Sequence, residues 1–166
     1  SIRDPLTRLY NRSYFYDSFT ALLPTIANGQ PVSVIVSDLD HFKRINDKYG
    51  HLQGDKVIQF VAKVLQDSVR QNDVAARIGG EEFALLLVNT PPDIAQSIAE
   101  RIRLAISQHD AASSNNQLPE SITISMGIFT AENLTVSVEE CVRRADEAMY
   151  RAKAAGRNRV EVWKAL

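Results

Sequence analysis

The stretch Gly79-Gly80-Glu81-Glu82-Phe83 lies between two apolar runs, residues 74–78 and 83–88. Because glycine adopts backbone angles that other residues avoid, the glycine pair predicts a tight reversal between two strands, a β-hairpin. The hairpin would present the carboxylates of Glu81 and Glu82 at its tip. Acids on such a rigid element are unfavourable unless a cation or a ligand uses them, so this tip is a candidate functional site.

A second acidic segment, Ser37-Asp38-Leu39-Asp40, ends another apolar run at residues 32–36. The Val and Ile density of that run predicts a strand buried on both faces. Carboxylates from two strand ends indicate a divalent metal site, and divalent metals indicate phosphate chemistry. Asp38 and Glu81 are the first candidates for ligands; the alternative is that they only end a strand and occupy a turn. We interpret Asp40 as a cap of the following helix rather than as a metal ligand.

The remaining segments predict an alternation of helices and strands. Helices are expected at residues 11–27, 42–49, 54–70, 91–106 and 138–155, and further strands at residues 121–129 and 160–163. Strands interleaved with long helices predict an α/β fold, with a mixed central sheet and helices packed on it.

Composition limits the classes of function. The 166 residues are expected to form one domain, and a formal net charge of −1 argues against a nucleic-acid-binding surface. The single cysteine, Cys141, excludes an internal disulfide and is expected to be a small core residue. No apolar run approaches the ~20 residues of a membrane span, so we expect no direct membrane contact by this domain.

Five segments together resemble the GGDEF family of diguanylate cyclases. They are DPLTRLYNR at 4–12, DLDHFKRIND at 38–47, GHLQGD at 50–55, GGEEF at 79–83, and ADEAMYRAK with GRN between 145 and 158. The resemblance covers essentially the whole chain, 1–166, in order, which makes it far more specific than one motif. Two positions depart from the family pattern: Glu82 replaces the commoner aspartate, and Arg8 stands where many members have glycine.

The resemblance implies a fold similar to the palm of nucleotide polymerases and of class III nucleotidyl cyclases. It implies that two GTP molecules condense into cyclic di-GMP with release of two pyrophosphates, one GTP being held by each domain of a homodimer. The implied cofactor is Mg²⁺, with Mn²⁺ as an alternative, and the implied location is cytoplasmic. The abrupt start of the chain leads us to expect a domain excised from a longer sensor protein.

The resemblance also assigns the reaction centre. It implies that the metal is bound by Asp38, Glu81 and the backbone carbonyl of Leu39. Glu81 is also a candidate general base for the ribose 3′ hydroxyl, although metal binding would weaken it as a base. Glu82 is either a further metal ligand or a neighbour that tunes Glu81, and Lys43 is expected to stabilise transition-state charge.

For GTP binding, the resemblance implies Asn46 and Asp55 as guanine contacts, His51 and Phe42 as further contacts, and Lys153 with Arg157 as triphosphate contacts. Backbone N–H groups at the start of the helix at Phe42 form an arrangement that binds anions. Alone, Asn46 would be read as a helix-end residue, Asp55 as an N-cap, and the Lys153–Arg157 pair as a solvated face.

A separate product site is implied by Arg70-Gln71-Asn72-Asp73, which ends five residues ahead of the glycine pair. Arginine can bind a guanine edge or a phosphate with two hydrogen bonds. Arg101 resembles a secondary contact. We expect cyclic di-GMP to inhibit the enzyme through Arg70 and Asp73. The alternative functions are a catalytically idle cyclic di-GMP receptor and a GTP-binding regulatory module.

Overall fold

The structure is a computed structural model that describes residues 1–113, 115–133 and 136–166. Its elements, in chain order, are α1 (Arg12–Ala21), α2 (Leu23–Ala27), β1 (Val32–Leu39), α3 (Phe42–Tyr49), α4 (His51–Ser68), β2 (Val74–Arg77), β3 (Glu82–Leu87), α5 (Pro92–Ser107), β4 (Ile124–Ala131), α6 (Val138–Ala154) and β5 (Arg159–Val162).

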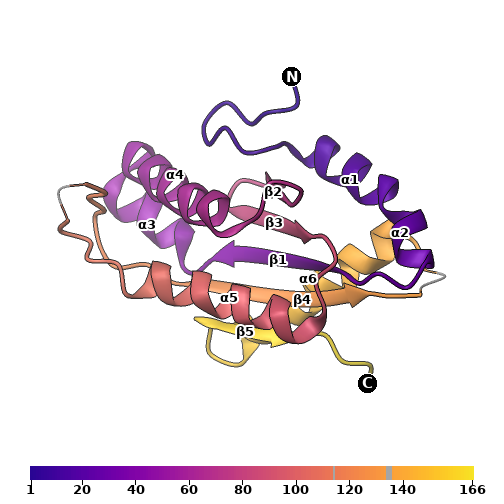
Figure 1. Cartoon of the computed structure of the whole chain (residues 1–166). Helices are drawn as coiled ribbons and strands as arrows, with labels where there is room; N and C mark the ends of the chain where they lie inside the picture. The colour runs from indigo at the N-terminus through magenta and orange to yellow at the C-terminus, as the bar shows by residue number, and fades with distance from the viewer. Residues whose placement is uncertain (114, 134–135) are drawn as a thin grey trace.

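The five strands form one mixed sheet in the order β2-β3-β1-β4-β5 (Figure 1). All neighbouring strands are antiparallel except β4 and β5, which are parallel. The predicted hairpin is β2–β3, and its register pairs Arg77 with Phe83 across the turn. The predicted α/β architecture is therefore confirmed.

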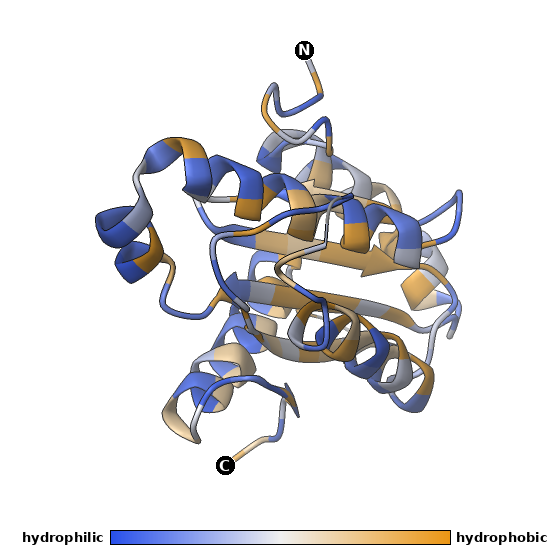
Figure 2. Cartoon of the chain, turned by 90° about the vertical axis from the view of Figure 1, so that its left-hand side faces the viewer, coloured by the Kyte–Doolittle hydropathy of each residue, from blue (hydrophilic) through white to orange (hydrophobic). Residues whose placement is uncertain are grey.

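Helices cover both faces of the sheet, so β1 in the centre is buried along its whole length. Ile35 and Leu39 pack with α4 and α5 on one face, whereas Val34 and Val36 pack with α1 and α6 on the other. Figure 2 shows the apolar strands between helices whose outward surfaces are polar. Each fully buried aliphatic side chain contributes about 1.5–3 kcal/mol, so this alternation fixes the register of β1 and the position of its acidic end.

Helix α6 approaches β4 closely at Gly127. A Cβ atom there would lie 2.1 Å from the carbonyl oxygen of Ala145 and 2.2 Å from the backbone nitrogen of Met149. Only glycine allows this approach, which sets the height of α6 above the sheet.

Several predicted boundaries were wrong. The helix expected at 11–27 is two helices, because a new helix begins at Leu23 with Pro24 in its first turn. Helix α4 begins at His51, so Asp55 is inside the helix and not its N-cap. The strand expected at 121–129 is shifted to Ile124–Ala131.

Glycine conformation also differs from expectation. The positive backbone φ angles of glycine occur at Gly29, Gly50 and Gly156, and neither Gly79 nor Gly80 has one, so the hairpin does not require the unusual angles predicted for it. Arg8, by contrast, has φ 63°, a left-handed angle that glycine adopts without strain and that explains why glycine suits this position.

No helix among the described residues is long and apolar enough to cross a membrane.

Candidate active site

The two predicted acidic segments meet at one end of the sheet. Asp38, near the end of β1, is paired in register with Glu82, the first residue of β3. The backbone N–H of Leu39 donates to the carbonyl oxygen of Glu81 over 3.3 Å. Residues more than 40 positions apart in the sequence are thus held side by side by sheet hydrogen bonds.

Asp38 is 8% exposed, and its two carboxylate oxygens have different surroundings. Lys153 in the last turn of α6 donates to Oδ2 over 2.7 Å. The Oδ1 atom is buried and has no hydrogen-bond partner among the described residues. A buried carboxylate oxygen without a donor is unfavourable, so the site is suited to a cation or a ligand donor.

Burial and repulsion raise the pKa values of the surrounding acids. Burial first, and then the neighbouring Asp38 carboxylate, raise the pKa of Glu81 to about 7, although Lys153 opposes the shift. Burial and the charges of Asp38 and Asp146 raise the pKa of Glu82. Burial and Asp38 likewise raise the pKa of Asp146. Four carboxyl groups therefore share the positive charge of Lys153.

Asp146 was missed in the sequence analysis. It lies seven residues, two helical turns, before Lys153 on α6 and therefore on the same face of the helix. That spacing was the available signal, but it has meaning only once the face of α6 that meets β1 is known.

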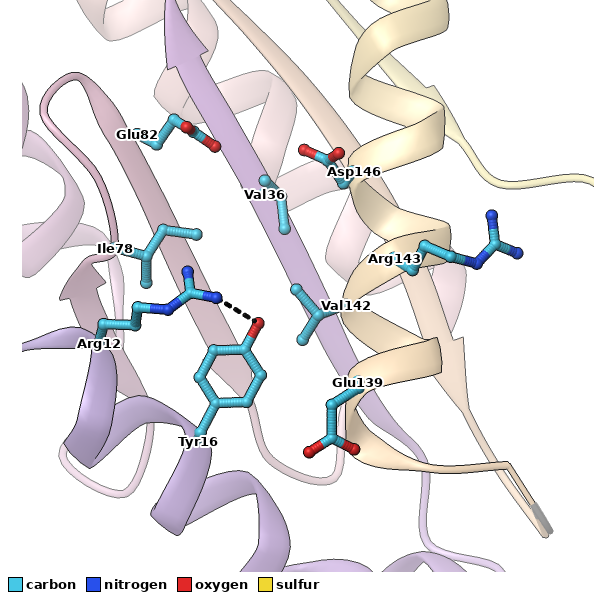
Figure 3. A pocket seen from close by; sticks show the side chains of 9 residues that line it. All are labelled: Arg12, Tyr16, Val36, Ile78, Glu82, Glu139, Val142, Arg143 and Asp146. Carbon is cyan, nitrogen blue, oxygen red and sulfur yellow. Dashed lines mark hydrogen bonds between the residues drawn. The ribbon is translucent and has the colours of Figure 1, made fainter.

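A cavity of about 260 Å³ adjoins the acidic cluster on the α1–α6 face of the sheet. Figure 3 shows Glu82 and Asp146 at one end of it, with the side chain of Val36 between them. Arg12 and Tyr16 of α1 form the opposite wall, joined by a long hydrogen bond of 3.5 Å. The cavity is thus lined both by two of the acids and by the guanidinium group of Arg12, whose charge acts on Glu82.

No group of three acidic, histidine or cysteine side chains in the described parts of the chain is arranged to hold a metal ion. The predicted set contains only two side chains, Asp38 and Glu81, and is completed by the Leu39 carbonyl.

The predicted guanine contacts lie between α3 and α4. The Oδ1 atom of Asn46 is buried and, within the described residues, has no hydrogen-bond partner. A Cβ atom on Gly54 would lie 1.8 Å from this oxygen, so glycine makes room for the amide. Asp55 is half-buried one residue further along α4, and His51 is exposed at its start. Asn46 and Asp55 are therefore on facing helices.

The start of α3 leaves backbone N–H groups available. Phe42 is its first residue, and His41 precedes it with φ 57° and makes no side-chain capping hydrogen bond within the described residues. Lys43 points into solvent: its side chain is 88% exposed, and its Nζ atom pairs with Asp47 over 2.9 Å. In this conformation Lys43 is turned toward Asp47 and not toward the acidic cluster.

The interpretation of Asp40 as a helix cap was wrong. Its carboxylate accepts hydrogen bonds from the hydroxyl groups of Thr123 and Ser125, both at 2.6 Å, and from the backbone N–H of Asn158 at 2.9 Å. All three donors belong to β4 and the segments beside it, so the buried Asp40 side chain connects the end of β1 to those segments. Arg157, the second predicted triphosphate contact, is exposed and precedes Asn158.

The predicted product site forms a separate cavity of about 350 Å³, lined by Arg70, Gln71, Asn72, Asp73, Val88 and Asn89. Asp73 is 7% exposed and accepts from the backbone N–H groups of Arg70 and Val88. Its carboxylate thus fixes the turn that carries Arg70, whose side chain is 64% exposed. Arg101 lines a different hollow on α5 and donates to the carbonyl of Ser68 over 3.2 Å.

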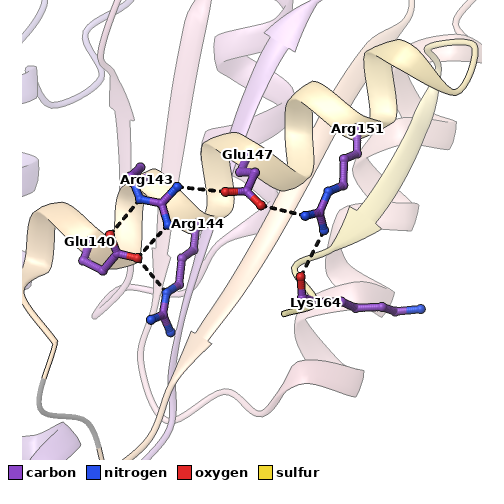
Figure 4. Close-up of polar contacts among 6 residues, drawn as sticks. All are labelled: Glu140, Arg143, Arg144, Glu147, Arg151 and Lys164. Atoms are coloured by element: carbon purple, nitrogen blue, oxygen red, sulfur yellow. Dashed lines mark hydrogen bonds and ion pairs between the residues drawn. The ribbon is translucent and has the colours of Figure 1, made fainter. Parts of the chain in front are cut away.

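Ion pairs on the outer face of α6 link its successive turns (Figure 4). Glu140 pairs with Arg143 and Arg144, and Glu147 pairs with Arg143 and Arg151. Hydrogen bonds from Arg143 and then Arg144 lower the pKa of Glu140 to about 2. The network supports the helix that carries Asp146 and Lys153.

Comparisons with known proteins support the resemblance in sequence and fold. The family model described as "Diguanylate cyclase, GGDEF domain" matches residues 1–159. The chain is 42% identical over 158 residues to diguanylate cyclase DgcM of Escherichia coli (strain K12), covering 95% of the chain and 37% of that protein. It spans between about a third and under half of the length of the curated relatives it matches.

Two solved structures are similar along most of the chain. The GGDEF domain of DgcB from Caulobacter crescentus, in complex with c-di-GMP, has a TM-score of 0.91 at 35% identity, covering 99% of this chain and 94% of that one. The active GGEEF domain of a diguanylate cyclase from Vibrio cholerae has a TM-score of 0.79 at 34% identity, covering 93% and 94%. The GGEEF motif of that domain has glutamate at the position that Glu82 occupies in this chain. The fold is therefore the palm-like cyclase fold that the sequence predicted, and the chain belongs to the GGDEF family of diguanylate cyclases.

Proposed function

We propose that this domain condenses two molecules of GTP into cyclic di-GMP and releases two pyrophosphates. The observation that carries the proposal is that Asp38 and Glu81 lie together at the end of the sheet. One oxygen of Asp38 is buried there and accepts no hydrogen bond from any described residue. In the reaction, the 3′ hydroxyl of one GTP attacks the α-phosphorus of the other. Negative charge then grows on the phosphate oxygens and on the leaving pyrophosphate, and the site must offset it.

The residues present fit a divalent cation, Mg²⁺ or alternatively Mn²⁺. Asp38, Glu81 and the backbone carbonyl of Leu39 would hold it, since these cations prefer oxygen ligands. When bound, the cation supplies positive charge for the phosphate oxygens and makes the 3′ hydroxyl more acidic.

The side chains of the domain supply the other charges. Glu81 is the candidate acceptor of the 3′ hydroxyl proton, although binding the cation would weaken it as a base. Glu82 raises the pKa of Glu81 further by repulsion and is the alternative ligand. Lys153, which is already at Asp38, binds the triphosphate together with Arg157. Lys43 is exposed and long enough to turn from Asp47 toward phosphate when GTP is bound.

Guanine is selected between α3 and α4. Asp55 accepts from the adjacent N1–H and N2–H₂ groups of the base, and the buried Asn46 amide meets further polar atoms. A site of this kind rejects adenine strongly, because the wrong base leaves buried polar groups unpaired. Phe42 begins the helix whose N–H groups bind phosphate, and His51 borders the base.

Cyclic di-GMP inhibits the enzyme at the cavity of Arg70 and Asp73, with Arg101 as a second contact. The product would link two domains in an arrangement that keeps their GTP sites apart. The relative from Caulobacter crescentus, solved with c-di-GMP, supports binding of this product by the family. Arg70→Ala should abolish inhibition by added product, and unchanged sensitivity would disprove the inhibitory site.

The decisive experiment uses the domain fused to a dimerising coiled coil and incubated with GTP and Mg²⁺. Chromatography of the nucleotides should show cyclic di-GMP, which Glu81→Ala should abolish. Glu132→Ala, an exposed acid after β4, is the matched control and should leave the product unchanged. The unfused domain should be weakly active, with a specific activity that rises with protein concentration, because each GTP needs a second domain.

The alternative function, a catalytically idle receptor, is favoured only by the cavity at Arg70 and Asp73. Binding of cyclic di-GMP without any turnover of GTP by the fused domain would support it. Binding of GTP without turnover and without product binding would instead indicate a GTP-binding regulatory module.

A further inference from the structure

The segment that joins α6 to β5 has an unusual backbone. Gly156, Arg157 and Asn158 have φ angles of 125°, 64° and 47°, three successive residues in the left-handed region. An arginine rarely adopts this conformation, because its Cβ atom approaches the following carbonyl oxygen. Such a segment keeps its shape only when surrounding contacts hold it.

Backbone hydrogen bonds to the end of α6 hold Gly156 and Arg157, and Asp40 holds the backbone of Asn158. The backbone N–H of Asn158 donates to Oδ2 of Asp40 over 2.9 Å, and Thr123 donates to the same oxygen. Ser125 donates to Oδ1, and the backbone N–H of Asp40 donates to the carbonyl of Thr123. The carboxylate is 4% exposed and is fixed from three directions.

This contact joins the two halves of the proposed triphosphate site. Asp40 directly follows Asp38 and Leu39, which belong to the metal side. Asn158 directly follows Arg157, which belongs to the phosphate side. We infer that Asp40 is a positioning residue, which sets the place of Arg157 relative to the metal ligands through the backbone of Asn158. The inference rests on the proposed function.

Two other roles of Asp40 predict different effects on GTP binding. A merely structural carboxylate would stabilise the fold without affecting GTP binding. A carboxylate that acts on Asp38 and Leu39 would affect GTP binding even when Arg157 is absent. A double-mutant cycle with Arg157 separates these roles, because only residues that act together show coupling.

The experiment measures the dissociation constant of 3′-deoxy-GTP with Mg²⁺ by calorimetry, since this analogue lacks the attacking hydroxyl and remains intact. Asp40→Ala should weaken binding about tenfold, or about 1.4 kcal/mol. Asp40→Asn should stay within about twofold, because its oxygen still accepts from Asn158 and the Ser125 hydroxyl can rotate to accept from the amide. In an Arg157→Ala background, Asp40→Ala should add less than about twofold.

Ser33→Ala is the matched control, because Ser33 on β1 is, like Asp40, a buried polar residue, and it donates to the carbonyl of Thr90 over 2.7 Å. It should lower the melting temperature and leave the dissociation constant unchanged. Equal weakening by Asp40→Ala with and without Arg157 would overturn the inference. Equal weakening by Asp40→Asn and Asp40→Ala would also overturn it, because charge and not position would then matter.

If Asp40→Ala does not fold, Arg103→Ala tests the same segment from outside. Arg103 donates to the Asn158 side chain over 2.9 Å and pairs with Glu100. Arg103→Ala should weaken binding about threefold and Glu100→Ala should not; equal affinities for the two variants would overturn the inference. If the fused wild type makes no cyclic di-GMP, the proposed function fails, whereas these binding constants still decide the role of Asp40.

Discussion

Replacing Gly127 by alanine should displace α6 from the sheet. The added Cβ would lie 2.1 Å, 2.2 Å and 2.8 Å from backbone atoms of Ala145, Met149 and Ala148. Ordinary contact begins near 3.4 Å, so the helix must move by more than 1 Å at this point. A shift of that size threatens the 2.7 Å contact between Lys153 and Asp38.

The cost follows from what obstructs the new atom. Overpacking a core typically lowers stability by about 1–3 kcal/mol. The smaller losses are expected where the obstructing side chains can rotate away. Here the obstructing atoms belong to the backbone of a helix, so we expect a loss of at least about 3 kcal/mol. For a domain of this size, that loss lowers the melting temperature by roughly 6–12 °C.

Urea denaturation followed by tryptophan fluorescence measures this loss. Trp163 is the only tryptophan in the sequence and packs edge-on against Phe129 of β4. Gly80→Ala is the control, since a Cβ there meets no atom of the described structure within 4 Å, and its stability should stay within about 0.5 kcal/mol of the wild type. A loss below about 1 kcal/mol for Gly127→Ala would refute the close approach of α6.

Burial raises the pKa of the Cys141 thiol to about 11, so the thiol should resist alkylation at pH 8 until the protein is unfolded, and rapid labelling of the native protein would contradict this. The free energy of unfolding should also fall above about pH 9, because the folded state retains a proton that the unfolded state loses. Arg144→Ala should lower the free energy of unfolding by about 1 kcal/mol in urea titrations, because it removes a guanidinium 4.5 Å from the Trp163 ring centre and a partner of Glu140; no change would show that these contacts are not stabilising. Asp55→Ala should reduce the preference for GTP over ATP at least tenfold in competition binding, and an unaltered preference would show that guanine is selected elsewhere.

Local sequence was sufficient for most of the fold. Apolar runs identified the strands, and the glycine pair located the hairpin although neither glycine needs a special angle. The predictions from local sequence were wrong at two helix boundaries. The first expected helix is divided near Pro24, and α4 starts at His51, separated from α3 by Gly50 alone. Boundaries of this kind depend on how neighbouring helices pack.

The candidate site was predictable where residues adjoin a recognisable motif and unpredictable where they act across the fold. Asp38 was identified because it ends an apolar run, and Glu81 because it follows the glycine pair between two such runs. The donors to Asp40 lie 83, 85 and 118 residues away, so a local interpretation assigned it to the nearest helix end. Asp146 was missed because its role depends on which face of α6 meets the sheet.

The register of the sheet explains why so many acids meet at one place. Residues paired across antiparallel strands have Cβ atoms about 4.5–5.5 Å apart, and like charges there are destabilising. The pairing of Asp38 with Glu82 is such a repulsive contact, and Glu81 and Asp146 add to it. The ammonium group of Lys153, which donates to Asp38, offsets part of this repulsion, and the pKa of Glu81 is raised to about 7 by burial and by Asp38. Under the proposed function, a divalent cation would offset the same repulsion, so metal binding and folding stability should be coupled at this site.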